Sequence, residues 1–230
     1  MPRRSRMYLP GFTYHIVQRG NNRQTCFFED GNYLLYLQLM REVIPRYGAD
    51  LHAYCLMTNH VHLLISPERD DSISNIMKVV CSRYAQYVNR KYSRTGSLWE
   101  GRHKASAVDT ENYLLKCYRY IECNPVAARM VERPEEYLWS SYRVNALGDD
   151  DDLVSPHKVY SLLGKTPESR HCQYRELFSS SLSEQDSASF RRATHYSMPI
   201  GSDCFIEKVS AEVGRHLGYM FRGRPEGKAG

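Results

Sequence analysis

The sequence predicts an α+β protein with a ferredoxin-like split β-α-β-β-α-β antiparallel sheet, helices on one face and a small, mostly helical C-terminal extension. Short segments with alternating apolar residues predict strands, and longer segments with apolar residues at helical spacing predict helices. The predicted elements follow one another in the order strand, helix, strand, strand, helix, strand, and a further helix comes next. The segments are residues 12–19, 30–47, 51–58, 60–66, 72–92, 103–108 and 111–122.

Turn and capping residues mark the ends of these elements in the same order. The first strand ends at the turn Gly20-Asn21-Asn22, and Gly48 stops the first helix. Thr58-Asn59 is short enough to join the second and third strands tightly. Asp71 opens the second long helix, and Thr110 is expected to cap the last one.

The chain is predicted to divide after residue 147. Residues 1–147 contain all the strands and form the sheet domain. Residues 148–230 begin with an acidic run at 149–152, which predicts a solvated linker before the helical extension. The helical stretches of that extension are expected around residues 154–163, 169–179, 183–193 and 203–217.

Composition and charge indicate a cytoplasmic protein with a polyanionic partner. The chain is 42% hydrophobic, and none of its apolar runs approaches the roughly 20 residues that span a bilayer. Seven scattered cysteines without a C-x-x-C pair argue against a disulfide framework and a cysteine-rich zinc site. Residues 1–125 hold 17 Lys and Arg against 11 Asp and Glu, whereas the remainder holds 14 against 15. The basic half favours binding to nucleic acid.

The segment Asn59-His60-Val61-His62 suggests half of a metal site. Residues two apart on a strand project from the same face, about 6.5–7 Å apart along the chain. His60 and His62 therefore point together, while Val61 faces the opposite layer. Two imidazoles are suitable ligands for a divalent metal, although surface histidines also occur at this spacing.

The helix around residues 116–126 offers a nucleophile and a further ligand. Tyr120 and Asn124 are four residues apart, so they lie on one helical face. An amide oxygen beside two imidazoles suits manganese or magnesium, and a phenol beside the metal can attack a phosphate. Tyr118 points to the other side of the same helix and is the rival nucleophile.

Three separated motifs, NHVHLL, GSLWEGRHKA and YRYIECNPVAA, together with the opening YHIVQRGNNR, resemble the single-tyrosine HUH transposases, specifically the REP-associated tyrosine transposases. The resemblance covers about residues 7–145. It implies that His60 and His62 bind the metal, that Tyr120 is the nucleophile, and that Asn124 is the third ligand. Many shorter relatives carry Gln at that last position.

The same resemblance implies a chemistry and a substrate. Cleavage would give a 5′-phosphotyrosine and a free 3′-hydroxyl without a nucleotide cofactor. The substrate would be a DNA hairpin from a repetitive extragenic palindrome with flanking single-stranded DNA. Because one helix carries both Tyr120 and Asn124, we expect a monomer whose tyrosine acts in cis.

Basic residues near these motifs are the predicted DNA contacts. They lie at the turn after the first strand, after the tryptophan loop and at both ends of the chain. The set is Arg3, Arg4, Arg19, Asn21, Arg23, Arg102, Lys104, Arg222 and Arg224, to which Arg6 and His103 are neighbours. Trp99 is expected either to stack on a base or to pack in the core.

Three other functions fit parts of the pattern. A protein of the same fold could bind hairpin DNA without cutting it, although the intact tyrosine and ligand set argue against this. An RNA-binding ferredoxin-like module would display aromatic residues such as Tyr14 and Tyr54 on its central strands. A metal-dependent hydrolase would use water in place of Tyr120.

Overall fold

The computed structural model describes residues 8–214 and confirms the predicted ferredoxin-like sheet. The four strands are antiparallel in the order β2-β3-β1-β4, so β1 and β3 are central. The strands are β1 (Thr13–Arg19), β2 (Ala49–Met57), β3 (His60–Pro67) and β4 (Lys104–Val108). Helices α1 (Asp30–Tyr47) and α2 (Ser72–Lys91) connect them as the split β-α-β-β-α-β order requires.

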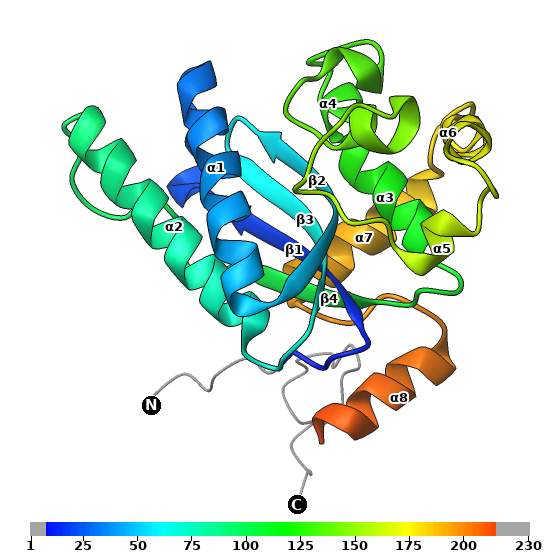
Figure 1. The fold of residues 1–230 in the computed structure, drawn as a ribbon. Coiled ribbons are helices and arrows are strands. Elements are labelled where there is room, and N and C mark those ends of the chain that lie inside the picture. The colour runs from blue at the N-terminus through cyan, green and yellow to red at the C-terminus, as the bar shows by residue number, and fades with distance from the viewer. Residues whose placement is uncertain (1–7, 215–230) are drawn as a thin grey trace, which may run out of the picture.

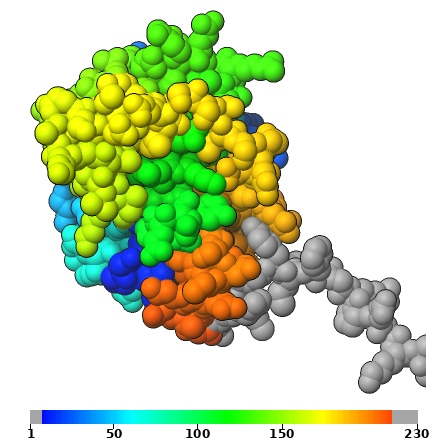
Figure 2. All heavy atoms as spheres, turned by 90° about the vertical axis from the view of Figure 1, so that its right-hand side faces the viewer, coloured from blue at the N-terminus to red at the C-terminus, as the bar shows by residue number. Residues whose placement is uncertain are grey.

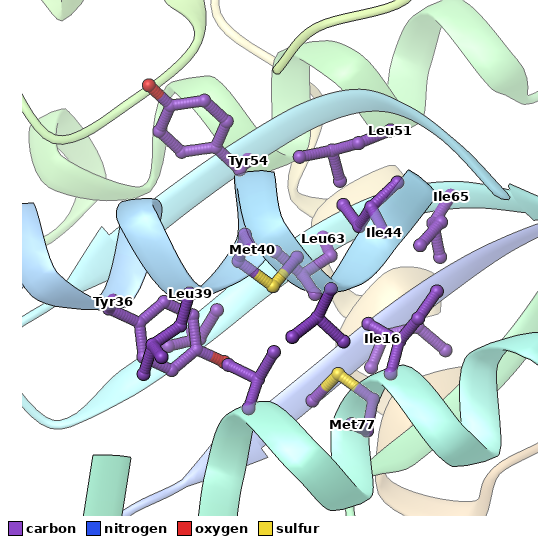
Figure 3. Close-up of a cluster of buried hydrophobic side chains, with 14 of the residues drawn as sticks. Ile16, Tyr36, Leu39, Met40, Ile44, Leu51, Tyr54, Leu63, Ile65 and Met77 are labelled. Atoms are coloured by element: carbon purple, nitrogen blue, oxygen red, sulfur yellow. The ribbon is translucent and has the colours of Figure 1, made fainter. Parts of the chain in front are cut away.

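Helices α1 and α2 cover one face of the sheet (Figure 1). Alternate strand residues such as Ile16 and Leu63 point to that face and pack with Met40 of α1 and Met77 of α2 (Figure 3). Because side chains alternate along a strand, the intervening residues of β1 and β3 point to the opposite face.

The opposite face is covered by helix α3 (Leu114–Glu122) and by helix α7 (Glu184–Tyr196) of the C-terminal extension. Leu64 of the sheet, Ile121 of α3 and Phe190 of α7 belong to one buried hydrophobic cluster. Figure 2 shows the segments after residue 148, in yellow and orange, around the green surface of α3. The extension therefore packs over the sheet face that lacks α1 and α2.

Short elements complete the part of the chain that the structure describes. They are the 3-10 turns Asn21–Arg23 and Pro134–Glu136, the π-helical turn Arg143–Leu147, and helices α4 (Asn124–Ala127), α5 (Lys158–Ser161), α6 (Pro167–Glu176) and α8 (Asp203–Val213). The predicted helical stretches of the extension correspond to α5–α8. No helix within residues 8–214 combines the length and apolar character needed to cross a membrane.

One local prediction was wrong, and a second holds only in part. Thr110 does not cap α3, which begins at Leu114; Asp109 instead accepts a hydrogen bond from the Glu111 backbone N–H and organises the turn before the helix. Three of the four aspartates at 149–152 are exposed, as predicted, but the side chain of Asp151 is only 8% exposed. Arg41 of α1 donates to Asp151 and to the exposed Asp152, each at 2.8 Å.

All seven cysteines lie within the described residues and are free thiols, and Cys26, Cys55 and Cys117 are buried in the core. Burial raises the pKa of the Cys26 thiol to about 12, which keeps it protonated and unreactive.

Candidate active site

Strand β3 places His60 and His62 side by side on the face opposite α1 and α2. Val61 and Leu63 are in the core below the helices, whereas Leu64 belongs to the cluster on the histidine side. The ring centroids of His60 and His62 are 4.8 Å apart. The predicted shared face is therefore present.

A hydrogen bond fixes the orientation of His60. Its Nδ1 lies 2.6 Å from Oδ1 of Asn59, and Nδ2 of Asn59 donates to the Arg23 carbonyl at 3.1 Å. Because the amide nitrogen is used on Arg23, the amide oxygen must accept from His60. His60 consequently carries its proton on Nδ1 and has a free lone pair on Nε2.

Helix α3 brings Tyr120 over the two histidines. The Tyr120 ring centroid lies 5.8 Å from that of His62, with the planes nearly perpendicular. Asn124 begins α4 one turn later, and its Nδ2 donates to the Tyr120 carbonyl at 2.7 Å. The amide oxygen of Asn124 is then the atom available to a ligand.

Tyr118 lies on the other side of α3, as the helical spacing predicts. Its side chain is fully buried against Tyr160 and Tyr174. A hydroxyl sealed in this cluster cannot reach a DNA phosphate. Of the two rival tyrosines, only Tyr120 lines the histidine cleft.

The buried carboxyl group of Glu122 anchors α3 to the segments that follow it in the chain. Glu122 accepts hydrogen bonds from Ser141 at 2.6 Å, Asn145 at 2.8 Å and Tyr174 of α6 at 2.7 Å. These donors come from two segments after α3, the turn around residues 141–147 and helix α6. Their convergence fixes the rotation of the helix that carries Tyr120, two residues away.

The histidines, Tyr120 and Asn124 line one cleft of about 1230 Å³. Four of the predicted DNA-contact residues line the same cleft: Arg19, Arg23, Arg102 and Lys104. The remaining lining side chains include Gln18, Glu100, Arg191, Arg192, Thr194, His195 and Tyr196. The cleft is therefore rich in cationic side chains around Tyr120, as a phosphate-binding site requires.

Other predicted contacts are not in the cleft. Asn21 is not among its lining residues, and its backbone N–H donates to the Leu98 carbonyl. Arg3, Arg4, Arg6, Arg222 and Arg224 lie outside the described residues. Trp99 is buried against Tyr36 and Tyr84 and donates to the Cys81 carbonyl, so the core interpretation is correct and base stacking is wrong.

Burial keeps the imidazoles of the cleft neutral. It lowers the pKa of His60 to about 4, with the positive charge of Arg19 adding to the effect, and lowers the pKa of His62 well below its usual value. Neutral imidazoles can donate a lone pair to a metal. Burial also raises the pKa of the Tyr120 hydroxyl, and the charges of Arg191 and Arg19 oppose that rise.

The donor set fits a small divalent cation. Within residues 8–214 no group of three or more His, Cys, Asp or Glu side chains could hold a metal. The two imidazoles and the amide oxygen of Asn124, which line the same cleft, could together hold a metal and leave positions for phosphate oxygens and water. Mixed nitrogen and oxygen donors of this kind suit Mn²⁺ or Mg²⁺.

Two groups of site residues were not predicted from the sequence. His15 of β1 lies behind His62, with the two rings 5.1 Å apart. Phe190 of α7 stacks on Tyr120 at 4.9 Å, and Arg191 follows it into the cleft. The alternation of YHIV could have indicated that His15 faces the His60–His62 side, but no local pattern places α7 there.

The family comparison matches the part of the chain that holds His60, His62, Tyr120 and Asn124. A model described as "Transposase IS200 like" matches residues 9–124, which include β1, β3 and all of α3. The chain belongs to the IS200-like transposase family. This confirms the resemblance to single-tyrosine transposases on which the site residues were predicted.

One solved structure supports the fold. A REP-associated tyrosine transposase bound to a REP hairpin is similar over 69% of this chain and 93% of that chain, with 19% identity and a TM-score of 0.55. A protein from Deinococcus radiodurans R1 is also 19% identical, over 47% of this chain and 88% of that chain, with a TM-score of 0.36. No curated protein matches the chain.

Proposed function

We propose that this transposase is a metal-dependent single-strand DNA endonuclease and strand transferase that cuts beside palindromic hairpins. The observation that carries the proposal is the convergence of Tyr120, His60, His62 and Asn124 in one cleft lined by arginines and lysine. Each member of that set has a role in phosphoryl transfer. We place the reaction in the cytoplasm.

The position of Tyr120 in the cleft supports it as the nucleophile, and the family resemblance implies which bond breaks. Its phenolic oxygen attacks the scissile phosphorus, the bond from phosphorus to the 3′ oxygen breaks, and the phenolic proton is transferred through solvent to that oxygen. The products are a 5′-phosphotyrosine and a free 3′-hydroxyl. Attack of a 3′-hydroxyl on the phosphotyrosine reverses the steps and rejoins DNA, so no nucleotide cofactor is needed.

The other cleft residues bind and orient the strand. His60, His62 and Asn124 would hold Mg²⁺ or Mn²⁺, which would polarise the scissile phosphate when bound. Arg19, together with the basic residues across the cleft, neutralises neighbouring phosphates. A hairpin substrate is supported by the neighbour of the same fold, whose structure contains a REP hairpin.

The alternative functions are less consistent with the fold. An RNA-binding sheet needs an open face, but helices cover both faces here and Tyr14 and Tyr54 are buried under α1 and α2. A protein that binds hairpins without cutting has no use for a tyrosine over two neutral imidazoles. A hydrolase that activates water remains the main competitor, and the product of cleavage separates the two.

We expect a 3′-labelled hairpin oligonucleotide with single-stranded flanks to become covalently attached to the protein in the presence of Mn²⁺. A 5′-labelled copy should release a shortened, protein-free strand with a 3′-hydroxyl. Denaturing gels resolve both products, and EDTA is the control. Cleavage that frees both labelled ends would indicate attack by water, and binding without cleavage would indicate a non-cutting protein.

We propose further that the protein is a monomer that cleaves in cis. Tyr120 already lies 5.8 Å from His62 of the same chain, so no exchange of helices between subunits is required. His62→Ala removes a ligand and Tyr120→Phe removes the nucleophile, and each variant alone should be inactive. Mixing the two should not restore adduct formation, whereas a wild-type protein mixed with either should keep its own activity. Recovered adduct in the mixture would show that sites are shared between chains.

A further inference from the structure

His62 has a second hydrogen-bonding partner that lies outside the set of proposed ligands. Nε2 of His15 is 2.8 Å from Nδ1 of His62, and the ring planes are 10° apart. Nearly coplanar rings with facing nitrogens have the geometry of an in-plane N–H···N bond. His15 is 1% exposed and does not line the cleft, so it touches His62 without being able to touch DNA.

The chain of bonds continues into the C-terminal extension. Nδ1 of His15 lies 3.2 Å from Oγ1 of Thr194, on helix α7. Both ring nitrogens of His15 are therefore occupied, one by His62 and one by α7. A neutral imidazole has one donor and one acceptor nitrogen, so the bonds to His62 and Thr194 must run in one of two directions.

The direction of the two bonds determines what His62 offers to the cleft. If His62 donates from Nδ1, its Nε2 carries a lone pair for a metal. If His15 donates to His62, then Nε2 of His62 carries a hydrogen and repels a cation. A threonine hydroxyl can accept as well as donate, so Thr194 permits the first direction.

His60, the other proposed histidine ligand, is held with its proton on Nδ1. Asn59 accepts from Nδ1 of His60 and leaves Nε2 of His60 free. Two ligands that share a metal both need that lone pair. His15 of strand β1 would therefore accept a hydrogen bond from Nδ1 of His62, as Asn59 accepts one from Nδ1 of His60.

We propose that His15 and Thr194 are positioning residues that hold His62 with its proton on Nδ1 and its Nε2 lone pair directed to the metal. This inference rests on the proposed metal-dependent function. It assigns a role to the C-terminal extension, because Thr194 lies far beyond the matched residues 9–124. Helix α7 thus sets the geometry of the metal site through the contact of Thr194 with His15.

The first test compares matched variants by their Mn²⁺ dissociation constants, measured by titration calorimetry in the absence of DNA. His15→Phe keeps a flat ring but removes the acceptor, and should weaken Mn²⁺ binding about 10- to 100-fold. His15→Gln restores an acceptor and should recover part of the loss. Thr194→Val should weaken binding by a smaller factor, whereas Thr194→Ser, which keeps the hydroxyl, should bind like wild type.

His52 supplies the control. It is 3% exposed, and its ring nitrogens bond to the Ser155 carbonyl and to Ser66, away from the cleft. His52→Phe should lower stability but leave the Mn²⁺ dissociation constant unchanged. Equal Mn²⁺ affinity in wild type, His15→Phe and Thr194→Val would overturn the proposal.

A measurement on the unmodified protein covers the case in which a variant fails to fold. Long-range ¹H–¹⁵N NMR spectra distinguish the two neutral histidine tautomers. We expect the Nδ1–H form for His62, and the Nε2–H form would overturn the proposal. If wild type and His62→Ala bound Mn²⁺ equally, the metal site itself would be wrong, and the tautomer of His62 would still decide the direction of the bonds.

Discussion

Tyr120→Phe is expected to eliminate the covalent protein–DNA adduct and to reduce strand cleavage by roughly 1,000-fold or more. The substitution removes only the phenolic oxygen. The ring continues to stack on Phe190 at 4.9 Å, so folding and hairpin binding should be retained. Labelled oligonucleotide cleavage measures the loss, and gel shift measures the binding.

Tyr118→Phe is the matched control for that result, because it makes the same change two residues away. The Tyr118 hydroxyl is buried and does not line the cleft. Its removal should leave cleavage within about twofold of wild type, since uncoupled substitutions have small effects. An inactive Tyr118→Phe variant beside an active Tyr120→Phe variant would reverse the assignment.

The second large effect concerns stability. Glu122→Ala should lower the free energy of unfolding by about 3–5 kcal/mol, because it removes an acceptor shared by three buried donors. Tyr174 is left without an acceptor, whereas Ser141 and Asn145 keep only their longer bonds to the Tyr54 and His52 carbonyls. Denaturant unfolding measures the change. Glu111→Gln, at an exposed position just before α3, should change it by less than about 0.5 kcal/mol.

Glu122 also predicts a pH dependence. Burial raises its pKa to about 7, against the opposing effect of the Ser141, Asn145 and Tyr174 hydrogen bonds. A carboxyl whose pKa is raised in the folded state makes its full contribution to stability at pH values below its pKa in the unfolded state. That contribution is lost as the pH rises through the folded-state pKa of about 7. Glu122→Gln cannot ionise, so its stability relative to wild type should increase by on the order of 3 kcal/mol between pH 4.5 and 8. A pH-independent difference would contradict the burial of an ionisable group at this position.

The sequence was sufficient to predict the sheet and the faces on which the histidines and Tyr120 lie, because both depend on short periods. The two-residue period of β3 brings His60 and His62 to one face, and the helical period of α3 separates Tyr120 from Tyr118. Asn124 kept its place one turn after Tyr120 even though α3 ends at Glu122 and a new short helix begins.

The residues that were missed depend on contacts between distant segments. His15 reaches His62 through the register of β1 on β3, across 47 positions of sequence. Thr194 reaches His15 across 179 positions, and Phe190 reaches Tyr120 from the same helix. The periodicity of α7 predicts a helix but not the sheet face on which it packs. Trp99 could not be assigned for the same reason. It lies in a loop whose packing partners are distant in the sequence, so both base stacking and core packing were open until the structure placed it in the core.

The site of covalent attachment tests the central claim most directly. Wild-type protein would be incubated with Mn²⁺ and a hairpin oligonucleotide, digested with protease and nuclease, and analysed by tandem mass spectrometry. The account predicts a nucleotide joined through its 5′ phosphate to the peptide that contains Tyr120, with the modification on that tyrosine. A modification on any other residue, or complete cleavage of the DNA without a covalent peptide, would contradict it.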